Sequence, residues 1–218
     1  MGNLKNEDHP GISRVPLAIA WLLLGVVLFL PSTAHALDKV VWVYDGDTVL
    51  LENGSQVRYL GIDTPEIDHE GGRSDVMAEE AKDVNRKLVE GKTIRLEYDR
   101  ERVDSHGRRL AYLFLPDGVM VNAVLVTRGL ARVMSIRPNL RYRDRLIRCQ
   151  REAMTRGIGI WKGLSRQGEN RIGNTRSYRF HRPDCPFAGQ ISRRNRMVFT
   201  SRFDAFWEGY APCRRCRP

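Results

Sequence analysis

The sequence predicts an α+β fold in which a small β-barrel with about three helices is followed by a small C-terminal domain. Three observations support this prediction. Short alternating segments separated by tight turns fill the first part of the chain, segments with helical periodicity follow, and three of the four cysteines lie within about forty residues of the end. Strands that precede helices are typical of α+β proteins. A chain of 218 residues is long enough for one core and a small second unit.

Residues 1–36 are expected to lie outside the fold. An apolar run at residues 15–30 follows Lys5 and Arg14, and Ala34-His35-Ala36 fits the small-residue pattern of a signal-peptide cleavage site. The run is short for a spanning helix, which needs roughly 20 apolar residues. We expect a cleaved signal peptide and a periplasmic or secreted protein. The alternative is an uncleaved membrane anchor that keeps the chain on the outside.

Residues 37–162 are expected to form the barrel domain. Its strands are predicted at residues 39–44, 48–51, 56–62, 93–98, 109–115 and 119–121, where apolar and polar residues alternate between turn signals such as Asn53-Gly54. Its helices are predicted at residues 76–90, 122–130 and 141–156 from apolar residues at helical spacing. Ser74 and Asp75 are expected to cap the first helix. This set of strands fits a small Greek-key barrel such as the OB-fold.

Residues 163–177 are expected to be a linker, because they are rich in Gly, Ser, Asn and Arg and have little apolar periodicity. A second domain at residues 178–218 follows. So small a unit usually needs a disulfide or a metal to hold it together.

The charge of the chain points to an anionic partner. The formal net charge is +10, and from Arg132 to the end 21 Lys or Arg residues stand against 6 Asp or Glu. Such a balance favours nucleic acid as the partner, with an anionic membrane surface second. Arginine also suits bidentate contacts with phosphate.

Three short motifs stand in order along the barrel domain. They are Tyr44-Asp45-Gly46-Asp47-Thr48, the strand end at residues 58–66, and the turn and strand at residues 104–112. Together with the segments at residues 121–122, 129–131 and 160–161, they closely resemble the staphylococcal nuclease (thermonuclease) family over residues 40–161. The resemblance implies a calcium-dependent phosphodiesterase that cleaves DNA and RNA with little base preference and leaves 3′-phosphates. We expect it to act as a monomer.

Each motif alone has an ordinary interpretation, such as a hairpin turn or a surface salt bridge, but their combination suits phosphodiester hydrolysis. Calcium takes only oxygen ligands, and by resemblance Asp47, Asp63 and Thr64 form the calcium site. The resemblance assigns catalysis to Arg58, Glu66 and Arg108. The two arginines are planar donors for the scissile phosphate, and Glu66 is expected to hold or deprotonate the attacking water.

The sequence departs from the family where tyrosines commonly frame the bound nucleotide. His106, Met134 and Ile136 stand at those places. A base-stacking platform is therefore weakened or replaced. His106 remains a candidate substrate-binding residue, with an exposed turn residue as the alternative interpretation.

The C-terminal domain carries four residues that can bind a soft or borderline metal. His181 and Cys185 form one close pair, and Cys213 and Cys216 form a second pair about 27 residues later. This spacing predicts a structural zinc site, with a disulfide as the alternative in an oxidising compartment. The segment resembles the metal-binding domain of Ada-type DNA methylphosphotriester repair proteins. His181 stands where that family has its methyl-accepting cysteine, so the resemblance implies zinc-stapled binding of nucleic acid rather than repair.

Two other functions are alternatives to a nuclease. A catalytically inactive OB-fold nucleic-acid-binding protein is one, but such relatives typically lose the acidic and arginine positions that are present here. Sensing of methyl damage on DNA is the other, and His181 argues against it.

Overall fold

The computed structural model describes residue 2 and residues 37–68 and 72–218. The expected signal peptide or membrane anchor at residues 1–36 therefore lies outside the described residues. Within the described part of the chain, none of the helices combines the length and the apolar character that crossing a membrane requires. The residues from Leu37 onward belong to one compact unit.

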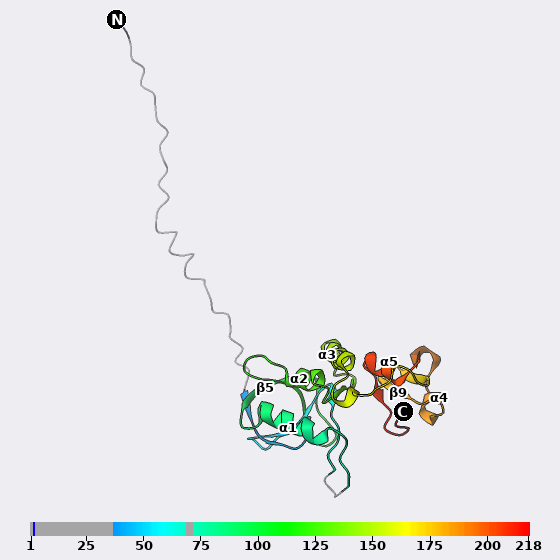
Figure 1. Cartoon of the computed structure of the whole chain (residues 1–218). Helices are drawn as coiled ribbons and strands as arrows, with labels where there is room; N and C mark the ends of the chain where they lie inside the picture. The colour runs from blue at the N-terminus through cyan, green and yellow to red at the C-terminus, as the bar shows by residue number, and fades with distance from the viewer. Residues whose placement is uncertain (1, 3–36, 69–71) are drawn as a thin grey trace. The chain divides into compact units, whose positions relative to one another are not determined.

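A closed five-stranded barrel forms the first half of this unit (Figure 1). Its strands are β1 Leu37–Val43, β2 Thr48–Leu51, β3 Gln56–Tyr59, β5 Thr93–Val103 and β6 Arg109–Phe114. They close in the order β1-β2-β3-β6-β5, with β3 and β6 parallel and the other pairs antiparallel. The predicted α+β fold with an OB-type barrel is confirmed.

The third strand is shorter than the predicted segment 56–62. It ends at Tyr59 because Leu60 and Gly61 form a turn, and Gly61 adopts φ +77°, a conformation that favours glycine. A separate two-residue strand, β4 Ile62–Asp63, pairs instead with β7 Arg132–Val133. This break directs Asp63 away from the barrel ladder and sets it opposite Arg132.

Three helices accompany the barrel, α1 Ala78–Val89, α2 Val121–Thr127 and α3 Arg143–Arg156, and a 3-10 turn, η1 Gly159–Trp161, follows. The predicted strand at residues 119–121 is wrong, because Val121 begins α2 and only Met120 makes an isolated bridge. The predicted cap of the first helix is also wrong. Its N-cap is Met77, and the side chains of Ser74 and Asp75 accept hydrogen bonds from the loop backbone at Asp68 and Glu66.

A four-stranded sheet of order β10-β8-β9-β11 forms the C-terminal part of the chain. Its elements are β8 Arg171–Asn174, β9 Arg179–His181, α4 Pro186–Gly189, η2 Arg193–Asn195, β10 Arg196–Phe199, α5 Arg202–Trp207 and β11 Ala211–Pro212. The predicted linker at residues 163–177 is thus wrong in its second half, since β8 is an inner strand of this sheet. Pairing with the two neighbouring strands, β9 and β10, makes this segment an ordered strand, which its composition alone does not indicate.

Helix α3 connects the barrel with the C-terminal sheet, as Figure 1 shows. Met154 and Trp161 share one apolar cluster with Phe180 and Phe206, so the two parts have a common core. Gln150 is fully buried between them. Its side chain accepts a hydrogen bond from the backbone N–H of Val133, 2.6 Å away, and donates one to the carbonyl of Phe206. A buried polar side chain whose oxygen and nitrogen are both hydrogen-bonded holds the two parts in a fixed relative position.

Candidate nuclease site

Asp47 lies in the turn between β1 and β2 and is held from several sides. Its side chain is fully buried and accepts hydrogen bonds from the backbone N–H of Thr64 at 3.0 Å and from the hydroxyl of Thr48 at 3.2 Å. The turn itself is fixed by Asp45, whose carboxylate accepts from the N–H of Asp47, and by Asn85 of α1, which donates to the Asp45 carbonyl. The side-chain position of Asp47 is therefore set before any ligand binds.

Asp63 and Asp47 are joined by the guanidinium group of Arg58. Arg58 makes an ion pair with Asp47 through Nη1, and its Nη2 lies 3.0 Å from Asp63 Oδ1. The other oxygen of Asp63 pairs with Arg132, its partner across β4 and β7. Sequence motifs found the first three residues. Arg132 was missed as a site residue, since its contact with Asp63 spans 69 positions and depends on the β4–β7 pairing.

Burial dominates the electrostatics of this cluster. Removal from water raises the pKa of Asp47 to about 8, and the neighbouring carboxylates Asp45 and Asp63 add to the effect, while Arg58 opposes it. The same carboxylates raise the pKa of Arg58 against its burial, so that guanidinium stays charged. Two buried carboxylates that lie close together repel each other, so an additional positive charge beside them stabilises their charged forms.

Glu66 follows the cluster at the end of the Asp63-Thr64-Pro65 turn and is exposed to solvent. Its backbone is fixed at both ends by Asp75, which accepts from the Glu66 N–H through its carboxylate and donates its own N–H to the Glu66 carbonyl. Its charge acts on Arg58, which places the two side chains within electrostatic range. Glu66 thus combines a fixed backbone with a carboxylate open to water.

Arg108 immediately precedes β6, the strand that pairs with the strand of Arg58. The parallel pairing of β3 and β6 sets Leu110 opposite Arg58, and Arg108 lies two residues before Leu110. Its Nε and Nη2 both lie 2.8 Å from Asp104 Oδ2. Burial alone would raise the pKa of Asp104, but hydrogen bonds from Arg108 and from the His106 N–H outweigh it and lower the pKa. Asp104 therefore positions Arg108, a role that the sequence analysis did not assign.

The three residues at the expected tyrosine places differ in their surroundings. His106 is exposed in the turn before β6, with its Nδ1 atom 4.0 Å from Asp104. Ile136 is also exposed, whereas Met134 is buried and its sulfur lies 3.3 Å from Nη2 of Arg179. None of these three side chains is a tyrosine.

Comparisons with known proteins identify the family of the chain. Residues 56–163 match the family model described as staphylococcal nuclease homologue. The thermonuclease of Staphylococcus hyicus is 36% identical over 126 residues, which cover 56% of this chain and 74% of that protein. The chain belongs to the staphylococcal nuclease family. Other relatives are the thermonuclease of Staphylococcus intermedius, 37% identical over 55% of this chain and 73% of its own length, and endonuclease YncB of Bacillus subtilis, 37% identical over 57% and 60%.

The site has the donors that a hard divalent cation needs. Asp47 and Asp63 present carboxylate oxygens, and Thr64 is held beside them by the hydrogen bond from its N–H to Asp47. An all-oxygen set suits calcium. Arg58 already places positive charge against both carboxylates, and burial raises the pKa of Asp47 in spite of it. The residues of this family member therefore fit a calcium ion.

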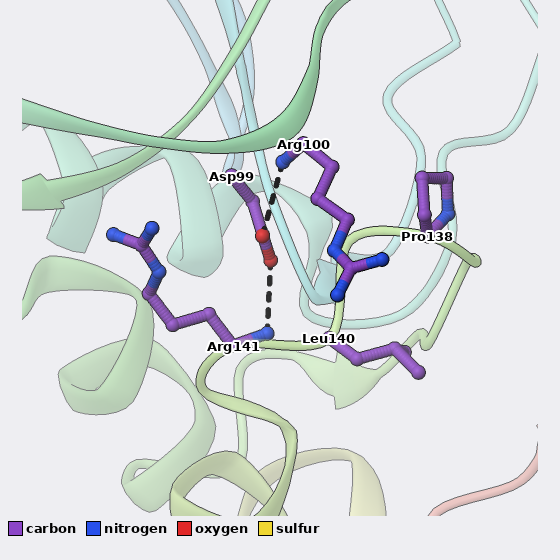
Figure 2. Close-up of a pocket in the computed structure, with 5 residues that line it drawn as sticks. All are labelled: Asp99, Arg100, Pro138, Leu140 and Arg141. Carbon is purple, nitrogen blue, oxygen red and sulfur yellow. Dashed lines mark hydrogen bonds between the residues drawn. The ribbon is translucent and has the colours of Figure 1, made fainter.

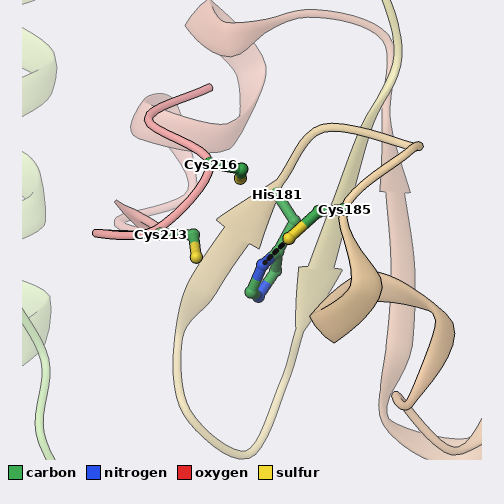
Figure 3. A group of neighbouring side chains, drawn as sticks. All are labelled: His181, Cys185, Cys213 and Cys216. Carbon is green, nitrogen blue, oxygen red and sulfur yellow. Dashed lines mark hydrogen bonds between the residues drawn. The ribbon is translucent and has the colours of Figure 1, made fainter.

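The four predicted zinc ligands come together in the C-terminal part (Figure 3). The ligand atoms of His181, Cys185, Cys213 and Cys216 all lie within 4.8 Å of one another, and Cys185 Sγ is 3.6 Å from His181 Nδ1. All four cysteines of the chain are free thiols in the structure. Burial alone would raise the pKa of Cys213, but hydrogen bonds from the backbone N–H groups of Cys216 and Arg215 outweigh it and lower that pKa. For Cys216, burial raises the pKa to about 11. A Cys₃His set at this spacing fits tetrahedral zinc.

A surface hollow of about 470 Å³ is a separate feature (Figure 2). It is lined by Asp99, Arg100, Pro138, Leu140 and Arg141. Asp99 accepts hydrogen bonds from the backbone N–H groups of Arg100 and Arg141, at 3.0 and 2.9 Å, so its carboxylate supports the loop rather than a ligand. None of the sequence-predicted site residues lines this hollow.

Proposed function

We propose that this nuclease of the staphylococcal nuclease family is an exported, calcium-dependent hydrolase that cleaves the phosphodiester bonds of DNA and RNA. Its products carry 3′-phosphates. The observation that supports this most strongly is the buried pair of carboxylates, Asp47 and Asp63, bridged by Arg58. An inactive nucleic-acid-binding relative would have no use for two buried acids that cost free energy to keep charged.

Calcium would be held by Asp47, Asp63 and Thr64, where it would neutralise charge on the scissile phosphate. Arg58 has five N–H donors, of which the two carboxylates take two. The remaining donors of Arg58, together with those of Arg108 that Asp104 leaves free, are suited to the oxygens of the phosphate as negative charge develops on them.

Glu66 is the base of the proposed reaction. Its exposed carboxylate accepts a proton from a water molecule as the oxygen of that water bonds to phosphorus. The bond from phosphorus to the 5′-oxygen breaks, the 5′-oxygen takes up a proton from solvent water as it leaves, and the phosphate stays on the 3′ side. A base at this step typically contributes about 10²- to 10⁴-fold to the rate.

The C-terminal module at residues 178–218 is proposed to be zinc-stapled and to help hold nucleic acid. The four converging ligands support zinc, and the free thiols do not favour the disulfide alternative. The likeness to Ada-type metal-binding domains, in which His181 replaces the methyl acceptor, supports nucleic-acid binding without repair. Export is proposed from the apolar run and the Ala34-His35-Ala36 pattern in residues 1–36, with a membrane anchor as the alternative.

Digestion of plasmid DNA and of RNA by the purified chain tests the function. We expect cleavage with calcium, none with excess chelator, and 3′-phosphate ends. Glu66→Gln and Arg58→Ala should each lose at least about 100-fold in kcat/KM, whereas Glu79→Gln, an exposed acid in the first turn of α1, should retain activity. Full activity of Glu66→Gln, or of the native chain in chelator, contradicts the mechanism. The mass of the N-terminus of the exported protein decides between cleaved signal and anchor.

A further inference from the structure

Arg179 reaches from the C-terminal sheet into the neighbourhood of the nuclease site. It is half-buried on β9, two positions before His181. Its Nη1 donates to the carbonyl of Pro212 at 3.1 Å, and its Nη2 lies 3.3 Å from the sulfur of Met134. The first contact ties Arg179 to the cysteine-bearing end of the module. The second brings it onto the segment that follows β7, next to the barrel.

Positive charge is in surplus around this side chain. Its electrostatic neighbours are the carboxylate of Asp63 and the guanidinium groups of Arg132 and Arg214. Asp63 is already paired with Arg58 and Arg132. One carboxylate therefore faces several guanidinium groups, and a bound anion would balance them.

Arg179 also contacts the residue at which the expected nucleotide platform is missing. Met134 stands where the family commonly has a tyrosine, and its sulfur touches Nη2 of Arg179. A guanidinium group at this place offers several N–H donors to a phosphate, whereas a tyrosine offers a ring face and one hydroxyl. The chain thus presents a charged group beside Met134.

We propose that Arg179 is a substrate-binding residue of the nuclease site and that it binds a backbone phosphate next to the scissile one. The inference rests on the proposed function, because it takes the cluster around Asp63 as the place of cleavage. The ligand is the phosphodiester backbone of a polynucleotide. The C-terminal sheet is then part of the substrate site rather than a separate binding module.

Steady-state kinetics on two substrates test the proposal. Arg179→Ala should raise KM for a single-stranded oligonucleotide of roughly ten nucleotides by about tenfold, the usual cost of one charge-assisted contact. Its kcat should change by less than about twofold, because the contact is made before and during the chemical step alike. The rise in KM that Arg179→Ala causes on a dinucleotide, which has no flanking phosphate, should be several-fold smaller. Arg179→Lys should lie between Arg179→Ala and the native chain.

Matched variants separate this role from a structural one. Arg86→Ala removes the same charge from an exposed position in the last turn of α1, outside the C-terminal module, and should leave KM near the native value. The zinc content and the melting temperature of Arg179→Ala check its fold. If that variant is unstable, the kinetic comparison is made with Arg179→Lys. Equal rises in KM on oligonucleotide and dinucleotide, or equal KM values for Arg179→Ala and Arg86→Ala, overturn the proposal.

A binding measurement keeps the proposal distinct from the nuclease assignment. Fluorescence anisotropy of a labelled oligonucleotide is followed with the Glu66→Gln chain, so that nothing is cleaved. Introducing Arg179→Ala into this chain should raise Kd by about tenfold. It should also reduce the slope of log Kd against the logarithm of the salt concentration by about one. An unchanged Kd contradicts the role of Arg179 even where the native chain is active. Absence of cleavage by the native chain contradicts the proposed function, while a weakened Kd still supports the contact.

Discussion

At the scale of single residues, Glu97 gathers three donors at the junction of β5 with the start of α3. Its Oε1 accepts from the Tyr142 hydroxyl and from Arg141 Nη1, each at 2.7 Å, and its Oε2 accepts from Arg95 Nη1 at 3.1 Å. Burial would raise the pKa of Glu97, but these hydrogen bonds outweigh it, so the pKa lies below its ordinary value of 4.5. The folded state thus favours the charged form of Glu97.

A lowered pKa of Glu97 predicts a loss of stability in acid. The contribution is fully present above pH 4.5, the ordinary value for this group, and is lost as the pH falls through the lower pKa of the folded state. Glu97→Gln should cost about 1–2 kcal/mol of unfolding free energy at pH 7 and much less at pH 3. Urea unfolding at both pH values measures this. Glu52→Gln, which removes an exposed acid paired with Lys39, is the control with little effect at either pH.

At the scale of residues, the sequence can indicate contacts that are encoded in local motifs. Asp63 and Thr64 are adjacent, and the hairpin at Asp47 has a recognisable turn signal, so their meeting at the barrel could be expected. Arg132 and Arg179 could not be found this way. Each reaches the site through pairing or packing of distant segments, and an arginine among many arginines carries no local signal.

At the scale of elements, a close approach of two backbones joins the end of α2 to η1. Gly129 and Gly159 both have positive φ, +69° and +59°, and a Cβ added at Gly159 would lie 2.1 Å from the carbonyl oxygen of Gly129. The N–H of Ile160 donates to that same carbonyl at 2.8 Å. The turn that leads from the barrel toward the C-terminal sheet therefore depends on the absence of a side chain.

Alanine substitutions at two glycines should separate backbone strain from steric exclusion. Gly118 has φ +85° and nothing within 4 Å of an added Cβ, so Gly118→Ala should cost only the strain of that conformation, about 1–2 kcal/mol. Gly159→Ala adds a clash with backbone that cannot rotate away, and it should cost at least about 3 kcal/mol. Denaturant midpoints of both variants measure the difference, and equal costs would argue that the α2–η1 contact relaxes freely.

Elements were predicted best where periodicity is strong. The barrel strands and the three helices were found near their observed positions, and errors of a few residues occurred at ends such as Tyr59 and Val121. The strand β8 was missed because its residues, Arg-Ile-Gly-Asn, have little strand propensity of their own. It is ordered by hydrogen bonds to β9 and β10, which local composition does not reveal.

At the scale of the whole molecule, barrel and C-terminal module act as one structure. Met154 and Trp161 share a cluster with Phe180 and Phe206, and Gln150 bonds both parts. Strand β9 carries Arg179 toward the proposed nuclease site and His181, a proposed zinc ligand, toward the thiols. If zinc is bound there, its loss should affect substrate binding at a distance, through the position of β9.

Zinc analysis of the purified chain and of two cysteine variants tests this coupling. We expect about one zinc per chain, as a single Cys₃His site binds one ion. Cys216→Ser should lose the zinc, lower the unfolding free energy by at least about 3 kcal/mol, and raise KM for an oligonucleotide as Arg179→Ala does. Cys149→Ser, a half-buried thiol of α3 outside the cluster, should keep the zinc and the native KM. A chain purified without zinc and with Cys213 and Cys216 oxidised would refute the metal site. A zinc-free Cys216→Ser chain with native KM would show that β9 holds Arg179 in place without the metal.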